Sequence, residues 1–512
     1  MTSAAGWRPV RLVLGQVWVL PALAMLFVGG FRLGTPEFWR DEVSTWTAAT
    51  RSFGDLLRLL QHVDASNGFY YLLLHGWTQV FGDSVIALRM PSVLAMTAAA
   101  AFVALTAERL FGNRVAGISA GLLFAVVPEI ARYAQEARSY ALVTCGVAGA
   151  TWFLVRALDR PGWQRWAPYC VAMAVAGAGH LISFSTIAGQ VAVVLLHLWR
   201  TRSAVQWRVL WQYPLAVAVA TLPVIPVMML GNEQSGRQLG WIIRPELGQL
   251  VHLGDSLFGG VGVYHAFTFL ALLALLLPGG RLPALQMLLL ALLPAIAVWV
   301  VSRNGTTSYF LERYLLFTVP AWAVLGGGGI GAVYALVTAP RRSRPAGHAR
   351  AAGVLLTVGL LVLPLVEAKP ALLAVRTVYG HTWAREHFRA AADLIAAGYR
   401  PGDGVAAPLG NQSWSMIGPG VDFYLPDGIE PYPVFVEHSA AQAEDLFPSA
   451  CPQPANCLGQ AQRIWLLVLG DTNDPMAAIP GDQSQALRAR YGAPSQVTAL
   501  GGVTVALLDR TG

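Results

Sequence analysis

Charged residues are scarce in this sequence. Only 12% of its 512 residues are charged, whereas 55% are hydrophobic. A soluble protein of this size carries about 25% charged residues, so the composition excludes a soluble globular protein and indicates a polytopic membrane protein. Lysine is nearly absent as well, since Lys369 is the one lysine among 35 basic residues. This bias is typical of a GC-rich genome and says nothing about chemistry.

Several motifs with a familiar chemistry are also missing. The sequence has no glycine-rich phosphate loop, no His-x-x-x-His zinc pair and no serine nucleophile elbow. The run Gly326–Gly329 lies inside an apolar stretch and indicates close helix packing. The net charge of +7 does not indicate a nucleic-acid partner, because the clustered arginines fall in short loops between apolar runs, as membrane topology requires.

Cysteine is rare, with four residues in the whole chain. Cys145 and Cys170 lie in apolar runs and are expected in the core. Cys451 and Cys457 flank a short proline-containing turn in a polar region. Because disulfides persist in oxidising compartments, we expect these two cysteines to pair if the region lies outside the cytoplasm.

Long apolar runs, in contrast, are abundant, and eleven of them approach or reach the length of a membrane span. The stretch 167–199 is divided at His180, because 33 residues would reach about 50 Å as one straight helix, too far for a single crossing. The first run lacks a small-x-small cleavage site, so we expect an anchor and not a removed signal peptide. The runs lie at 11–31, 85–107, 115–131, 139–157, 167–183, 184–199, 209–230, 261–279, 283–302, 314–337 and 352–368.

The distribution of arginine predicts the orientation of these runs. If Arg8 and Arg11 lie in the cytoplasm, eleven spans place all the remaining arginine-rich loops there too. We therefore predict a protein of the cytoplasmic (inner) membrane, with a transmembrane domain at 1–368 and an extracytoplasmic domain at 369–512. The other outer segments are then 32–84, 129–138, the hinge at 180, 231–258 and 303–313.

Two outer segments carry secondary-structure signals of their own. The loop 32–84 is too long for a simple connector and holds helical patterns at Phe53–His62 and Gly68–Phe81. In the tail, short apolar runs alternate with amphipathic patterns, which predicts a small α/β domain. Its expected strands are Gly404–Pro408, Tyr432–Val436, Ile464–Leu469 and Val503–Leu508, and its expected helices are Thr382–Ala397 and Ser484–Tyr491.

The stretch 36–46 follows the first apolar run directly. Glu37, Arg40, Asp41 and Glu42 should therefore lie at the membrane surface, where charges are costly unless they are solvated, paired or functional. The flanking aromatic residues and the adjacent Asp-Glu pair favour a site. A polar loop that merely ends a helix is the competing interpretation.

Three further polar clusters fall on the same predicted face: 132–140, His180 and 309–314. Arginines can hold a phosphate, a carboxylate can take a proton from a hydroxyl, and aromatic rings can stack on sugars. Together they predict a reaction on a lipid-linked anion. Each cluster also has a structural interpretation: arginines 132 and 138 paired with Glu136, a satisfied polar His180, and an interfacial anchor at Arg313 and Tyr314.

The sequence resembles the GT-C membrane glycosyltransferases related to protein O-mannosyltransferases and aminoarabinose lipid A transferases, and within them the bacterial mannosyltransferase branch. The resemblance covers about the first 340 residues. Its motifs are Trp39-Arg-Asp41-Glu42, Asn67-Gly-Phe-Tyr70-Tyr71 with His75, Ser84-x-x-Ala-Leu-Arg89-x-Pro91-Ser92, Tyr133-Ala-Gln135-Glu136-Ala-Arg138-Ser-Tyr140, His180 and Arg313-Tyr314-Leu-Leu.

The resemblance implies a GT-C fold with about eleven transmembrane helices and the transfer of a hexose, mannose favoured, or a pentose. The donor would be a polyprenyl-phosphate sugar, and the acceptor a hydroxyl of a glycan, glycolipid or protein at the outer membrane face, usually with inversion. It implies that Asp41 is the general base, that Glu42 orients it or binds acceptor, and that Arg138, Arg313 and Tyr314 hold the donor phosphate. The substrate-binding residues it implies are Arg40, Asn67, Tyr70, Tyr71, His75, Tyr133, Gln135, Glu136 and His180.

This chain departs from the family pattern at two positions. Many relatives have serine where Ala134 stands, and the hinge histidine is commonly followed by tyrosine, whereas Leu181 follows His180 here. The chemistry requires no cofactor, and it leaves open a divalent metal between Glu136 and His180.

Two other classes of function are weighed against a transferase. A flippase or other transporter of lipid-linked saccharides would place polar residues near the bilayer midplane, in broken helices, whereas the ionisable residues here gather at one face. A non-catalytic membrane scaffold with an extracytoplasmic binding domain would leave the four polar clusters without a purpose.

Overall fold

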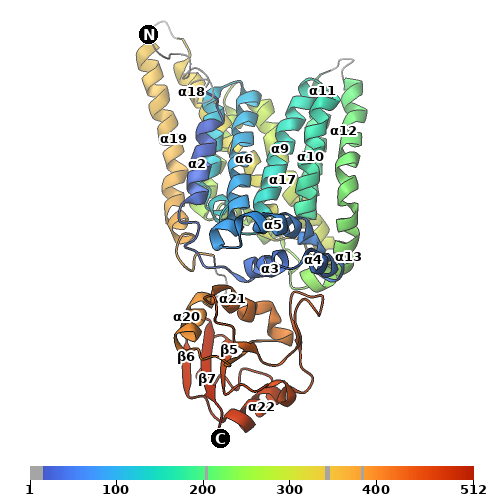
Figure 1. The fold of residues 1–512 in the computed structure, drawn as a ribbon. Coiled ribbons are helices and arrows are strands. Elements are labelled where there is room, and N and C mark those ends of the chain that lie inside the picture. Colours follow the sequence, from blue (N-terminus) through green and yellow to red (C-terminus); the bar gives the residue numbers. More distant parts are fainter. Residues whose placement is uncertain (1–14, 202–205, 341–345, 382–385, 512) are drawn as a thin grey trace, which may run out of the picture. The chain divides into compact units, whose positions relative to one another are not determined.

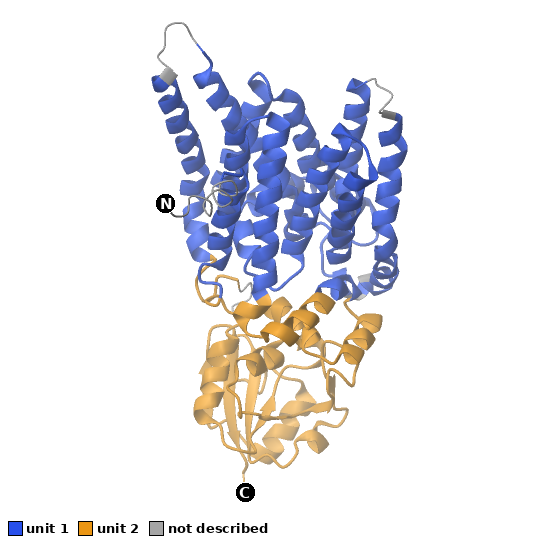
Figure 2. Cartoon of the chain, turned by 45° about the horizontal axis from the view of Figure 1, so that its top comes forward, with its two compact units in different colours: residues 1–33, 65–70, 89–374 blue, residues 34–64, 71–88, 375–512 orange. Residues whose placement is uncertain are grey.

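The computed structural model describes residues 15–201, 206–340, 346–381 and 386–511. The chain forms two compact units, each built from separate stretches of sequence (Figure 2). Unit 1 comprises Met1–Leu33, Ala65–Tyr70 and Arg89–Ala374, and unit 2 comprises Gly34–Asp64, Tyr71–Leu88 and Val375–Gly512.

Unit 1 is a helical bundle (Figure 1), and each of the eleven predicted runs contains a helix. Seven helical segments are long and apolar enough to cross a membrane, and three shorter apolar helices, α2, α7 and α16, accompany them in the described part of the chain. The predicted polytopic α-helical fold is therefore confirmed. The α-helices are α2 (Val19–Gly30), α6 (Val85–Phe111), α7 (Arg114–Val126), α8 (Pro128–Tyr133), α9 (Tyr140–Asp159), α10 (Trp163–Gly179), α11 (Thr186–Arg200), α12 (Gln206–Thr221), α13 (Ile225–Leu239), α14 (Leu247–Val251), α15 (Leu253–Leu257), α16 (Val261–Leu276), α17 (Arg281–Asn304), α18 (Val319–Thr338) and α19 (Ala346–Ala374).

The predicted break at His180 is confirmed. Helix α10 ends at Gly179, His180 is extended with φ −164° and ψ 118°, and the 3-10 helix η2 (Leu181–Ser185) leads into α11. Similar short 3-10 segments are η1 (Ala65–Asn67), η3 (Leu222–Val224) and η4 (Glu312–Thr318).

Helix α18 lies at the centre of the bundle, packed against α7, α16, α17 and α19. A Cβ on Gly327 would lie 2.5 Å from the backbone oxygen of Ala116, and one on Gly329 would lie 2.0 Å from that of Leu270. The glycine run therefore allows backbones to approach closely, as its position in an apolar run predicts.

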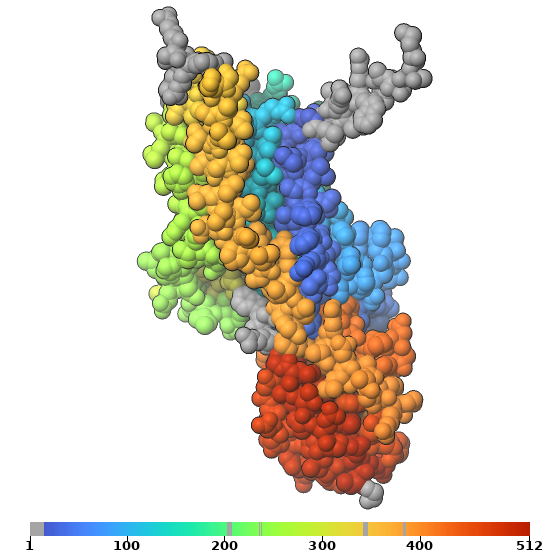
Figure 3. Space-filling view, turned by 90° about the vertical axis from the view of Figure 1, so that its left-hand side faces the viewer, coloured from blue at the N-terminus to red at the C-terminus, as the bar shows by residue number. Residues whose placement is uncertain are grey.

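Helix α19 lies at the surface of unit 1 (Figure 3). Only 17% of its most apolar 18-residue stretch is buried, compared with 89% for the corresponding stretch of the segment that contains α18. Leu355 and Val366 are 72% and 61% exposed. Such a row of exposed apolar side chains suits contact with lipid, and it agrees with a multi-pass membrane protein.

Unit 2 contains a five-stranded sheet with the strand order β2-β1-β5-β7-β6. Strand β1 pairs in parallel with β2 and β5, whereas β7 is antiparallel to β5 and β6. The predicted α/β architecture is thus confirmed. Its elements are β1 (Gly404–Ala406), β2 (Tyr432–Pro433), β3 (Val436–His438), β4 (Ser449–Ala450), β5 (Arg463–Leu469), β6 (Gln496–Ala499), β7 (Val503–Asp509), η5 (Gly410–Ser415), η6 (Pro454–Cys457), α20 (Phe388–Gly398), α21 (Ile417–Tyr424) and α22 (Gly481–Tyr491).

Most of the loop after the first span folds as part of unit 2, and Ala65–Tyr70 belong to unit 1. Helices α4 (Phe53–His62) and α5 (Gly68–Phe81) have the bounds predicted from the sequence, and α3 (Arg40–Ala49) was not predicted. An apolar cluster joins this loop to the tail, because Leu446 packs with Ala48, Leu56, Leu59, Val63 and Tyr71. Each compact unit thus combines stretches that are distant in the sequence. That 369–512 forms a domain by itself stays a prediction.

Glu37 links the loop to the tail by two hydrogen bonds. Its carboxylate accepts the backbone N–H of Arg389 in the first turn of α20, and its own N–H donates to the oxygen of Val378 at 2.7 Å. The side chain is only 1% exposed. Burial raises its pKa to about 7, although the hydrogen bond and the charge of Arg389 oppose this rise.

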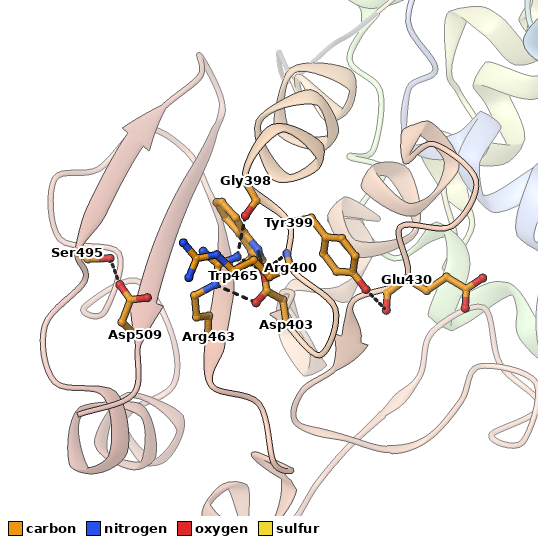
Figure 4. Close-up of polar contacts among 9 residues, drawn as sticks. All are labelled: Gly398, Tyr399, Arg400, Asp403, Glu430, Arg463, Trp465, Ser495 and Asp509. Carbon is orange, nitrogen blue, oxygen red and sulfur yellow. Dashed lines mark hydrogen bonds and ion pairs between the residues drawn. The ribbon is translucent and has the colours of Figure 1, made fainter. Parts of the chain in front are cut away.

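A buried ion pair lies where β1 and β5 begin (Figure 4). The guanidinium of Arg463 donates to both carboxylate oxygens of Asp403, at 3.0 and 2.6 Å, and to the oxygen of Gly398 at 2.7 Å. Asp403 also accepts from the Trp465 indole at 2.9 Å and from the N–H of Arg400 at 3.0 Å. The paired charges are therefore well satisfied. Elsewhere in this unit, Cys451 and Cys457 form the predicted disulfide, which closes a short loop.

Replacement of Arg463 should destabilise unit 2 strongly. Arg463→Ala leaves the carboxylate of Asp403 buried without its cation, which costs about 3–5 kcal/mol. Arg488→Ala removes an exposed partner of Asp474 and should cost no more than about 1 kcal/mol. Thermal unfolding in detergent, followed by near-UV circular dichroism, measures both. Equal shifts for the two variants would contradict this role of the buried pair.

The stability of unit 2 should fall as pH rises from 4.5 to about 7. In this window folded Glu37 keeps a proton that the unfolded chain has lost, because its pKa is raised from 4.5 to about 7. The loss is up to about 3 kcal/mol for this carboxyl. Glu37→Gln should flatten the dependence of the unfolding temperature on pH, whereas Glu437→Gln, at an exposed position of β3, should not. An unchanged slope in Glu37→Gln would refute this assignment.

Candidate functional site

The residues predicted for a site are divided between the two units. Unit 1 holds Asn67, Tyr70, Tyr133, Gln135, Glu136, Arg138, His180, Arg313 and Tyr314. Unit 2 holds Arg40, Asp41, Glu42, Tyr71 and His75.

In unit 1, the turn between α8 and α9 is tied to its neighbours by buried hydrogen bonds. The amide of Gln135 donates to the oxygens of Gly29 and Phe31 at 2.9 and 2.7 Å. The hydroxyl of Ser92 donates to the oxygen of Glu136 at 2.6 Å, and Tyr70 lies 3.2 Å from the same hydroxyl. Tyr70 and Gln135 therefore position the turn in this structure, and their direct contact with a substrate stays a prediction.

The turn presents Arg138 to a cluster that also contains Arg313 and His180. Both guanidinium groups interact electrostatically with His180, although α9, the hinge and η4 are far apart in sequence. Arg138 and Arg313 are 9% and 7% exposed. We call Arg132, Arg138, Arg313 and His180 the arginine cluster.

Aromatic rings surround this cluster. The rings of His180 and Tyr314 are 4.4 Å apart, and Tyr140 lies 6.2 Å from Tyr314 and 5.2 Å from Tyr133. The guanidinium of Arg313 lies 5.7 Å from the ring of Trp241 and 5.6 Å from that of Tyr314. Such contacts fix the plane of a guanidinium.

Acidic residues accompany the arginines. Glu129 lies 3.7 Å from Arg132, and Glu136 also interacts with Arg132. The positive charges of Arg313 and Arg132 repel each other. Like-charged guanidinium groups repel when they are held together at low dielectric. An anion bound among them would relieve this repulsion.

In unit 2, Asp41 lies in the first turn of α3. This helix begins after Trp39, which is extended with φ −101° and ψ 167°, and two carboxylates in its first turn suit the positive end of the helix. The Asp41 side chain is 22% exposed, and its Oδ1 lies 3.7 Å from Nε of Arg40. Glu42 is fully buried, so Asp41 is the carboxylate of this pair that solvent can reach.

Residues of the tail hold α3 in place. The N–H of Phe38 donates to the hydroxyl of Tyr424 at 2.8 Å. The ring of Phe423 stacks on Phe38 at 4.6 Å and meets Trp46 edge-on at 5.1 Å. No local pattern indicates these partners, because they lie several hundred residues away along the chain.

Glu386 is a third carboxyl at this site, which sequence analysis missed. It is 1% exposed and interacts electrostatically with Arg40 and Asp41. Burial raises its pKa to about 7; the charge of Arg40 lowers the pKa and that of Asp41 raises it. We call Arg40, Asp41, Glu42 and Glu386 the Asp41 site.

The remaining predicted residues of the loop have contacts within the fold. Tyr71 is buried and donates to the carboxylate of Asp64, and Nδ1 of His75 lies 3.0 Å from the oxygen of Ala49. Asn67 ends η1 and is half-buried. Contact of these three with a substrate stays a prediction.

A metal site is not evident from side-chain grouping. Among the residues that the structure describes, no three His, Cys, Asp or Glu side chains gather as a metal would need. The metal dependence, including an ion between Glu136 and His180, stays a prediction.

Residues 69–230 match the family model described as dolichyl-phosphate-mannose-protein mannosyltransferase. This region includes the turn with Arg138 and the hinge at His180. No curated protein matches the chain.

Solved structures match over nearly the whole chain. ArnT from Cupriavidus metallidurans bound to undecaprenyl phosphate is 16% identical, with a TM-score of 0.58 over 99% of this chain and 98% of that one. The apo state of the same protein also has 16% identity, with a TM-score of 0.56 over 99% and 98% of the two chains. At this identity the likeness shows a shared fold. The chain therefore shares the fold of ArnT, and together with the family model this confirms the resemblance predicted from its sequence.

Proposed function

We propose that this protein transfers a glycosyl group from a polyprenyl-phosphate donor to an acceptor hydroxyl at the outer face of the cytoplasmic membrane. The sugar is a hexose, with mannose favoured by the family description, or a pentose. The observation that carries the proposal is the arginine cluster. In it, the nearly buried Arg138 and Arg313 interact electrostatically with His180, and tyrosine side chains pack around them. The undecaprenyl phosphate named for ArnT, whose fold the chain shares, supports a donor of this kind.

Arg138 and Arg313 hold the donor phosphate. When the bond between the anomeric carbon and the phosphate oxygen breaks, negative charge develops on the leaving lipid phosphate. Guanidinium groups fixed in advance stabilise that charge most where water is excluded, and both arginines are nearly buried. Tyr314, Tyr133 and Tyr140 keep the cluster in shape through their ring contacts.

Asp41 acts as the general base. It accepts the proton of the acceptor hydroxyl while the hydroxyl oxygen bonds to the anomeric carbon from the side opposite the phosphate, so the configuration inverts. Asp41 suits this role because it is partly exposed next to Arg40, whereas Glu42 is buried. Glu42 orients Asp41 or binds the acceptor. The reaction needs no cofactor, and the acceptor is a hydroxyl of a glycan, glycolipid or protein.

The test of the function uses the purified protein with polyprenyl-phosphate mannose and polyprenyl-phosphate arabinose. Release of lipid phosphate that depends on an added acceptor supports the proposal. If neither donor yields lipid phosphate with any acceptor, the proposed function is wrong.

Arg138→Ala and Arg313→Ala should each weaken binding of polyprenyl phosphate by about tenfold or more, because each removes a charge-assisted contact of about 1.5–3 kcal/mol. Lysine should restore little, since it lacks the planar fork of arginine. Arg109→Ala, which removes a partner of Asp159 elsewhere in unit 1, is the matched control. Binding is measured by titration of the protein in nanodiscs. Unchanged affinity in both variants would refute the assignment.

Asp41→Asn keeps the size of the side chain and removes its basicity. If Asp41 is the base, turnover should fall about 10²–10⁴-fold while donor affinity stays near normal. Glu42→Gln should cost less turnover if Glu42 only orients Asp41. If Asp41 only interacts with the positive end of α3, loss of its charge costs at most about 1 kcal/mol of stability, so the structural interpretation expects near-normal turnover. That result, in folded and inserted protein, would move the base to another carboxylate.

A further inference from the structure

Trp414 is exposed next to the Asp41 site. It is 45% exposed in η5, although its neighbours Ser413 and Ser415 are 9% and 0% exposed. The guanidinium of Arg40 lies over its ring, 5.0 Å from the centroid, and the same arginine contacts Asp41. One arginine therefore links an open indole surface to the proposed base.

The backbone around Trp414 is held in an uncommon conformation. Met416 follows η5 with φ 54° and ψ 24°, the left-handed region that side chains other than glycine rarely adopt, and it is buried. Its N–H donates to the oxygen of Ser413 at 3.0 Å, and the hydroxyl of Ser415 donates to the oxygen of Gln412 at 2.8 Å. Such strain persists only where the surroundings enforce it, and it often marks a functional site.

The same segment is fixed to α3. Helix α21, which begins directly after Met416, packs on α3 through Phe423, Phe38 and Trp46. The position of Trp414 relative to Arg40 is therefore set by packing on both sides of the contact. A rigid, exposed aromatic ring of this kind can bind a ligand with little loss of side-chain entropy.

We propose that Trp414 and Arg40 form an acceptor platform that binds a sugar ring of a carbohydrate acceptor. The inference rests on the proposed function and narrows its acceptor to a glycan or the glycan part of a glycolipid. The apolar C–H face of a sugar ring stacks on the indole, whose quadrupole attracts polarised C–H groups. Arg40 has five N–H donors in a fixed fork for the sugar hydroxyls, and its contact with Asp41 places the base beside the bound ring.

A membrane lipid is the competing occupant of an exposed tryptophan. The side chains around Trp414 favour the carbohydrate, because the residues that η5 exposes with it are polar: Asn411 is exposed and Gln412 half-exposed. Arg40 and Asp41 are also partly exposed. A tryptophan that inserts into lipid would be expected beside apolar side chains.

The test compares Trp414→Ala, Trp414→Phe and Trp414→Leu with Tyr432→Ala, which removes another exposed aromatic ring of unit 2, on strand β2. Loss of stacking should raise the acceptor KM for mannotriose or arabinotriose about three- to tenfold in the alanine variant. The rate of lipid phosphate release to water, without acceptor, should stay unchanged. Phenylalanine should restore most of the affinity, leucine little, and Tyr432→Ala should behave as wild type.

Direct binding of the same trisaccharides, measured by saturation-transfer NMR on protein in nanodiscs, separates this inference from the proposed function. Trisaccharide binding that is lost in Trp414→Ala supports the platform even if no transfer is detected. Equal binding and equal KM in wild type and Trp414→Ala overturn it, whatever the transferase activity. Rescue by leucine as complete as by phenylalanine identifies an apolar contact that needs no aromatic ring, as a lipid contact would, and also overturns it. If Trp414→Ala fails to fold, the contrast between the phenylalanine and leucine variants decides.

Discussion

The cost of removing ionised groups from water shapes both units of this protein. In unit 2 the charges of Asp403 and Arg463 are balanced one against one, and indole and backbone groups complete their hydrogen bonding. In unit 1 several buried arginines lie close together with carboxylates, and they act on one another and on a common histidine. The first arrangement pairs one cation with one anion, whereas the second gathers several cations in one place.

The same constraint distinguishes the two neighbouring carboxylates of α3. Glu42 is fully buried, whereas Asp41 remains partly in water beside Arg40. Glu386, brought in from the tail, adds a third carboxyl whose pKa is raised to about 7 by burial. The surroundings of Asp41 therefore come from two stretches of the chain that lie more than 300 residues apart in the sequence.

Hydropathy predicted the membrane helices well, because each span must be apolar along its own length, and this hydrophobic signal is local in the sequence. Helices α4 and α5 were equally visible, since Ser52 caps α4 and its apolar residues recur at helical spacing. Helix α3 and strand β6 were missed, because α3 carries charges in its first turn and the β6 side chains are mostly exposed. Glu386, Phe423 and Trp414 could not be predicted as site residues, since their partners lie more than 300 residues away and no local pattern encodes such contacts.

The assembly of unit 2 from separate stretches of the chain has a consequence for biosynthesis. Its first two stretches end at Leu88 and its last begins at Val375, so the ribosome makes roughly 290 residues between them. At typical rates of synthesis this takes roughly 15–60 s. During that interval α3 lacks the aromatic and carboxylate partners that position it, and its apolar face stays uncovered. The nascent chain would therefore depend on a chaperone, or on contact of this loop with the bilayer surface, until its last segment is made.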